Sequence, residues 1–274
     1  MKSHLRPLPR ILRMLFIAIA AISTAHAQTA PPAPSTQTLP AVPMSPAADP
    51  SFAVAAIKPH DPTSSRQGFS TAGDRFTIRN ETVSSLICFA YAIHPHQIVD
   101  APDWLRADPY DIAGKPDAEG EPSLSQQQGM IKKLLADRFQ LKLHIEKREL
   151  PVYAIRVAKG GPKLTPAANP NAEPDQNGNG HGTEQDQTYT SASIDNLVLG
   201  MNFFLDRPAV NQTGLTGRFD FSIRYAWDEA HVADPNAPPG IFTAVQEQLG
   251  LKFEPVRAPV DVLVIDHIER PSPN

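Results

Sequence analysis

Apolar residues recur with a helical spacing at two places in this chain, each directly after a hydroxyl residue. At the first place, Thr82 is the expected N-cap of an amphipathic helix with apolar positions at Val83, Leu86, Ile87, Ala90 and Tyr91. At the second place, Ser193 precedes a helix of the same kind, with apolar positions at Ile194, Leu197, Val198, Met201 and Leu205. The spacing therefore predicts two equivalent helices.

The segment after each predicted helix alternates between apolar and polar residues, as half-buried strands do. Tyr110 and Ile112 mark the first of these strands, and residues 219–225 form the second. A second helical spacing follows in both places, at residues 131–139 and 242–249. Helix, strand and helix therefore occur twice in the same order.

Two strands are predicted after each second helix. They are expected at residues 141–147, 152–157, 251–256 and 262–268. The continuous apolar stretch Val260–Ile268 is typical of a central strand that is buried on both faces.

The two series of elements keep an almost constant offset. Leu141 matches Leu251 after 110 residues, and Leu86 matches Leu197 after 111. The offset predicts an α+β fold with internal duplication, in which each of two similar subdomains has a small, mainly antiparallel sheet and two helices. Chance recurrence of a common α+β order is the alternative.

Two segments lack any hydrophobic period. Residues 28–50 contain seven prolines and one charged side chain, which predicts a disordered tether. Residues 162–187 are too polar to pack and are predicted to be a disordered linker. The two ordered halves are therefore expected at residues 51–161 and 188–271.

Residues 1–27 have the pattern of a secretory signal peptide. Four basic residues precede the short apolar run 14–22, and Ala25-His26-Ala27 provides a cleavage pattern before Gln28. We therefore expect export to the periplasm or the extracellular space, without stable membrane insertion after cleavage. An uncleaved N-terminal anchor is the alternative.

Composition and charge agree with an exported globular protein. The 274 residues are 41% hydrophobic and 20% charged, and the single cysteine excludes an internal disulfide framework. Cleavage would leave 21 basic against 29 acidic side chains and change the net charge from −4 to −8. This acidity argues against nucleic acid as a partner. Cys88 lies in an apolar run, so we expect a buried small hydrophobe rather than a nucleophile.

Catalytic motifs are missing from the sequence. It contains no Gly-x-Ser-x-Gly, Ser-x-x-Lys or His-Glu-x-x-His pattern, and the spaced glycines from Gly178 to Gly182 follow no predicted strand. We therefore assign no catalytic, cofactor-binding or metal-binding residue and expect no cofactor. The lack of motifs disfavours enzymatic activity, and an enzyme is the alternative because groups that meet only in space leave no local signature.

Several polar residues still have two interpretations. His94 and His96 have the spacing of a metal-binding pair, but Pro95 between them favours a turn. Trp104 is expected to fill the core under a loop rather than to anchor a ligand. Capping and turn roles, rather than calcium binding, are expected for the acids around it: Asp100, Asp103, Asp108 and Asp111.

The order of several short motifs resembles that of a large family of exported proteins known only as a domain of unknown function and expanded in soil acidobacteria. The motifs are Phe52–Pro59, Arg75–Thr77, Ala101–Leu105, Tyr110–Ile112, Leu134–Phe139, Glu149–Ala154, Lys159–Lys163, Thr213–Gly217 and Val262–Asp266. The resemblance covers residues 51–271. Related domains are appended to membrane metallopeptidases of the antibiotic-sensing type, so the resemblance implies a sensor or binding role and supplies no catalytic residue.

These observations lead to two functional hypotheses. The leading one is an exported, tethered, non-enzymatic binding or sensor module of the cell envelope, with an envelope protein or peptide as its partner. The alternative is a hydrolase of an envelope polymer or peptide, with Asp103, Asp108 or Asp111 as candidate acids.

Overall fold

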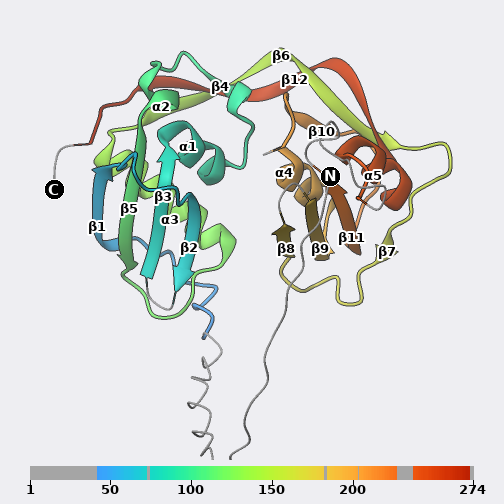
Figure 1. Cartoon of the computed structure of the whole chain (residues 1–274), viewed down its shortest axis with the longest axis horizontal. Helices are drawn as coiled ribbons and strands as arrows, with labels where there is room; N and C mark the ends of the chain where they lie inside the picture. The colour runs from blue at the N-terminus through green and yellow to red at the C-terminus, as the bar shows by residue number, and fades with distance from the viewer. Residues whose placement is uncertain (1–41, 73–74, 182–183, 203, 227–236, 272–274) are drawn as a thin grey trace, which may run out of the picture. The chain divides into compact units, whose positions relative to one another are not determined.

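The protein has a mixed α+β fold, as predicted. The computed structural model describes residues 42–72, 75–181, 184–202, 204–226 and 237–271 (Figure 1). The predicted signal peptide and residues 28–41 of the predicted tether lie outside these ranges. Among the described residues, no helix is long and apolar enough to cross a membrane.

The first sheet has four antiparallel strands in the order β1-β5-β3-β2. Their bounds are Phe52–Pro59 for β1, Gly68–Ala72 for β2, Arg75–Thr82 for β3 and Pro109–Pro116 for β5. The first hydrophobic cluster joins residues of β1, β3 and β5 to residues of three helices. These helices are α1 (Val83–Tyr91), α2 (Trp104–Ala107) and α3 (Leu124–Arg138).

A second antiparallel sheet has the strand order β7-β11-β9-β8. Its strands are β7 (Thr165–Pro166), β8 (Asp175–His181), β9 (Glu184–Ala192) and β11 (Phe219–Ala226). Helices α4 (Ile194–Asn202) and α5 (Ile241–Leu249) share the second hydrophobic cluster with β9 and β11. The helices and alternating strands predicted from the sequence are therefore present in both parts of the chain.

Two long strands run beside each other through the fold, β6 (Lys142–Val157) and β12 (Leu251–His267) (Figure 1). They pair antiparallel along almost their whole length, and each carries a short parallel strand on its outer side. The short strand β10 (Ala209–Asn211) pairs with β6, and the short strand β4 (Ile98–Val99) pairs with β12. The 3₁₀ helix Pro95–Gln97 lies directly before β4.

The structure has two long strands where the sequence predicted four, and prolines 151, 255 and 259 do not interrupt them. The amide of Tyr153 donates to the Pro208 carbonyl, away from β12, so the Tyr153–Pro255 pair exchanges no hydrogen bond within the ladder. Hydrogen-bonded and non-hydrogen-bonded pairs alternate in an antiparallel ladder. The pairs of Pro151 and Pro259 lie an even number of positions from the Tyr153–Pro255 pair, so they are also non-hydrogen-bonded pairs. None of the three prolines therefore removes a hydrogen bond from the ladder.

Side chains of β12 alternate between the two faces of the strand. On one face, Leu251 belongs to the second hydrophobic cluster, and Leu263 and Ile265 belong to the first. The opposite face, from Ala258 to Val264, forms a third cluster with Val152. Strand β12 is a central strand, as predicted, but burial on both faces is limited to residues 262–265, because Asp261, Asp266 and His267 are exposed.

The structure differs from the sequence prediction in the two segments expected to be disordered. Residues 162–187 contain β7, β8 and the start of β9. Strand β8 is polar, but its backbone pairs with β9 over its full length. The pattern of hydrophobic residues in the sequence gives no sign of this backbone pairing. In the predicted tether, Met44 is buried and its amide donates to the Glu121 carbonyl, so the end of that segment packs against the fold.

A bulge interrupts β3 before helix α1. The register shifts between Ile78 and Glu81, and Asn80 lies in the left-handed region at φ 51°. The Asn80 amide donates to Asp111 at 3.0 Å, and the same carboxylate accepts from His60 Nδ1 at 2.7 Å. Burial acts to raise the pKa of Asp111, but these hydrogen bonds outweigh it and lower the pKa overall.

We predict that Asp111→Ala lowers the free energy of unfolding by about 1–3 kcal/mol, because it leaves the half-buried Asn80 amide and His60 without their acceptor. Urea unfolding followed by circular dichroism measures the change. The control is Asp261→Ala, which removes an exposed ion pair with Lys147 and should have little effect. Equal stability of the two variants would contradict the structural role of Asp111.

Candidate functional site

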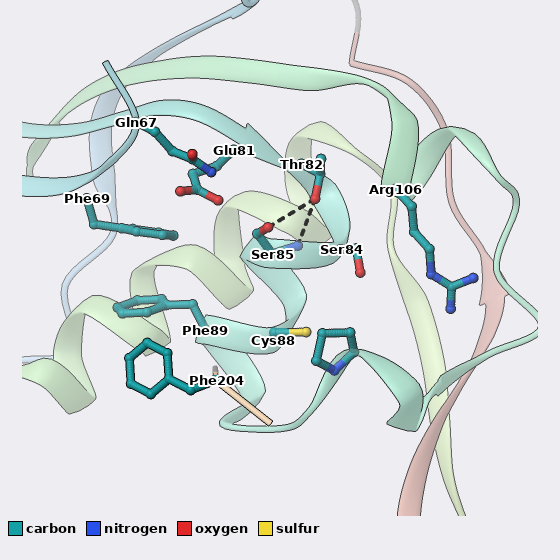
Figure 2. Close-up of a pocket in the computed structure, with 11 residues that line it drawn as sticks. Gln67, Phe69, Glu81, Thr82, Ser84, Ser85, Cys88, Phe89, Arg106 and Phe204 are labelled. Carbon is teal, nitrogen blue, oxygen red and sulfur yellow. Dashed lines mark hydrogen bonds between the residues drawn. The ribbon is translucent and has the colours of Figure 1, made fainter. Parts of the chain in front are cut away.

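A cavity lies where β3 ends and α1 begins. Its volume is about 590 Å³, which is within the range of small-molecule sites. The residues around it come from the segment before β2, from β2, β3, α1, the 3₁₀ helix and α2, and from the segment after α4 (Figure 2). Elements that are far apart in the sequence therefore build one site.

One side of the cavity is aromatic. Phe69 of β2 and Phe89 of α1 stack with their ring centroids 4.6 Å apart and their planes at 21°. Phe204 lines the same cavity, and Figure 2 shows all three rings on one side of it. Such a wall can bind an apolar or aromatic group of a ligand.

The hydroxyl groups of the site belong to the helix cap. Thr82 ends β3 and caps α1, with its Oγ1 accepting from the Ser85 amide at 3.1 Å and lying 3.0 Å from Ser85 Oγ. Ser84 is buried beside them and also lines the cavity. The predicted N-cap is therefore confirmed, and it lies at the edge of the site.

Glu81 is the acidic group of the cavity, and only 8% of the residue is exposed. Burial raises the pKa of its carboxyl, while hydrogen bonds with Ser85 and Gln67 act in the opposite direction. Both hydrogen-bond partners are neutral. Among the ion pairs of the described residues, none involves Glu81.

Arg106 of α2 is the basic residue of the lining. Its Nη2 donates to the Ile98 carbonyl at 3.2 Å, which holds the side chain against the start of β4. In Figure 2 the guanidinium points away from the three phenylalanine rings. Glu81 and Arg106, the two charged residues of the lining, therefore lie on different sides of the cavity.

Cys88 is buried, as expected from its apolar surroundings. Cys88 also lines the cavity. Burial raises the pKa of its thiol to about 12, while Ser84 and Arg106 have smaller effects that lower this pKa. A thiol with this pKa is protonated at neutral pH and is a poor nucleophile.

Of the two histidines considered as a metal-binding pair, His94 uses both ring nitrogens in structural hydrogen bonds. His94 is buried, and its Nδ1 accepts from the His96 amide at 3.1 Å. Nε2 must then carry the proton that is donated to the Leu205 carbonyl at 3.0 Å. Burial lowers the pKa of His94 and favours this neutral form. The described residues contain no group of three or more His, Cys, Asp or Glu side chains placed to hold a metal ion.

Three of the four acids around Trp104 have separate partners, so the structure does not bring these carboxylates together. Asp100 pairs with Arg148, Asp108 with Arg270, and Asp111 with His60. Asp103 occupies the N-cap position of α2 without a side-chain cap bond. Trp104 is half-buried against the first cluster, as predicted, and the Arg270 guanidinium lies 4.9 Å from its ring centroid. None of these residues lines the cavity.

Sequence reasoning missed the residues that do form the cavity. Glu81 precedes a helix, where an acid is ordinary, and Phe69 and Phe204 lie outside the strongest periodic patterns. The sequence signal nearest to the site was the predicted N-cap Thr82, but a helix cap by itself does not indicate a ligand-binding site.

The fold and the cavity together define an α+β protein with an aromatic-walled cavity of small-molecule size. The family described as Protein of unknown function (DUF3738) matches residues 84–268, and the chain belongs to this family. The resemblance seen in the sequence is thus confirmed at the level of a domain of unknown function. No curated protein and no solved structure matches the chain.

We predict that Cys88 in the native protein resists thiol reagents despite its position in the lining. At pH 8 its reaction with Ellman's reagent should be on the order of 1000-fold slower than in the urea-unfolded chain, because so little thiolate is present. Cys88 is the single cysteine, so the absorbance change reports it alone. Rapid native modification with one equivalent would contradict the described burial.

Proposed function

We propose that this protein is an exported, non-enzymatic binding module whose ligand occupies the cavity beside Phe69 and Phe89. The observation that carries the proposal is the composition of the lining, in which an aromatic wall adjoins a few buried polar groups. Small-molecule sites have this combination, since the apolar wall supplies affinity and the polar groups fix the orientation of the ligand.

The cellular setting in the proposal is the cell envelope. Residues 1–27 support export, and the mature acidic chain favours an envelope protein or peptide as partner over nucleic acid. The sensor-type role rests on the resemblance to domains appended to regulatory membrane metallopeptidases. In such a role, the partner would bind differently to the ligand-bound and ligand-free forms of the protein.

The competing hypothesis of a hydrolase has less support. It requires Asp103, Asp108 or Asp111 to act on a substrate, and two of these carboxylates already accept hydrogen bonds from Arg270 and His60. The cavity itself offers Glu81, hydroxyl groups and an inert thiol. This set of groups fits binding better than hydrolysis.

We also propose that the two halves of the protein derive from an internal duplication. The strand orders β1-β5-β3-β2 and β7-β11-β9-β8 correspond strand by strand, with α1 after β3 and α4 after β9. Both β3 and β9 end in a bulge with one residue at φ 51°, Asn80 in the first and Ser191 in the second. The amides of these residues donate to Asp111 and Asp220, respectively.

An experimental structure provides the test of duplication. We expect residues 76–158 to superpose on residues 188–268 with α1 on α4, α3 on α5 and β6 on β12. The two bulges should coincide, because the corresponding strands have the same connections. Equivalent strands that point in different directions after superposition of the helices would contradict the duplication.

Ligand binding can be tested with the neutral apolar fluorophore N-phenyl-1-naphthylamine, which becomes brighter in a dry cavity. We expect saturable binding to the purified chain at one site. Gln67→Trp should weaken it at least 10-fold, because the exposed Gln67 lines the cavity and a larger side chain would fill it.

Gln212→Trp is the matched control, since it adds the same indole at an exposed position outside the lining. This variant should bind the fluorophore like the unmodified chain. Absence of saturable binding, or equal weakening by both substitutions, would reject the cavity as the binding site. Turnover of a cell-wall substrate by the purified protein would reject the non-enzymatic part of the proposal.

A further inference from the structure

We propose that the cavity selects a small organic cation with an apolar body, of the arylalkylammonium type, and that Glu81 is its counter-ion. This inference rests on the proposed function and adds the chemical class of the ligand. It follows from the charge and burial of the groups around the cavity, described in turn below.

The first argument is the environment of Glu81. More than nine-tenths of this residue is buried, and its hydrogen-bond partners Ser85 and Gln67 carry no charge. No described basic side chain forms an ion pair with it, whereas Asp108 pairs with Arg270 and Asp111 with His60. A buried carboxylate is costly without an opposite charge, and a cationic ligand would provide that charge.

The second argument is the aromatic wall next to this carboxyl. Figure 2 shows the Glu81 carboxyl beside Gln67, on the same side of the cavity as the Phe69 ring. The Phe69 and Phe89 rings are stacked, and Phe204 extends the apolar surface. Aromatic faces attract organic cations through the ring quadrupole, and they bind the apolar body of such a ligand at the same time.

The other titratable groups of the lining do not compete for this role. The Cys88 thiol is neutral. Arg106 donates to the Ile98 carbonyl, and its guanidinium points away from the phenylalanine rings (Figure 2). Strand β5 places Tyr110 opposite Glu81 in the sheet, and burial keeps this phenol in its neutral form. Glu81 is thus the charged group beside the aromatic wall.

The test compares two ligands of nearly equal size, phenethylammonium chloride and neutral 2-phenylethanol. Each displaces N-phenyl-1-naphthylamine from the purified chain at pH 7. We expect the ammonium ion to bind at least 10-fold more tightly than the alcohol. Glu81→Gln should remove this preference while fluorophore binding persists, and the exposed control Glu119→Gln should retain the preference.

The pH dependence gives a second measurement on the unmodified chain. Alkylammonium ions stay protonated below about pH 8, so a change in their affinity at acidic pH reports Glu81. The pKa of Glu81 is raised by burial. The ammonium preference should therefore decline as the pH falls through this pKa, whereas 2-phenylethanol binding should stay nearly constant.

The outcomes separate this inference from the proposed function. Saturable fluorophore binding without any preference for the ammonium ion would overturn the inference and leave the binding module in place. Loss of fluorophore binding from the unmodified chain would overturn both. Since the ligand comparison uses the unmodified chain, it is decisive even if Glu81→Gln fails to fold.

Discussion

The antiparallel pairing of β6 with β12 is the constraint on which the rest of the fold depends. Both large hydrophobic clusters contain residues of this ladder, with Leu263 in the first and Leu251 and Ile155 in the second. A shift of one residue would turn these side chains to the opposite face. It would also move Pro255 and Pro259 into positions where the ladder needs an amide donor. Packing and backbone chemistry therefore select the same register.

The candidate site follows from how β3 ends within this framework. The bulge at Asn80 shifts the register of the strand, and Asp111 holds the bulged amide. Bulges redirect the side chains that follow them, and Glu81 comes next, buried at the cavity. Thr82 then caps α1, which supplies Phe89. The capping interaction and the chemistry of the site thus occupy one short stretch of chain.

Periodicity in the sequence predicted the elements but not the site. The α1 helix with its Thr82 cap and the alternating strand Phe219–Ala226 are present because local side-chain patterns determine them. Strand β8 was missed because its stability comes from backbone pairing with β9, which leaves no apolar signal in the sequence. Glu81 and Phe204 line the same cavity although they are far apart in the sequence, so no local spacing along the chain could predict that they share a site.

The electrostatics of the protein explain why Glu81 stands apart from its other acids. Exposed pairs such as Lys147–Asp261 are screened by water and contribute little to stability. Glu81 differs from these exposed acids because burial disfavours its charged form, and its neutral hydrogen-bond partners offset that cost only in part. The proposed cationic ligand would supply the opposite charge that the described residues do not give Glu81, so the proposal accounts for a buried carboxyl group beside an aromatic wall.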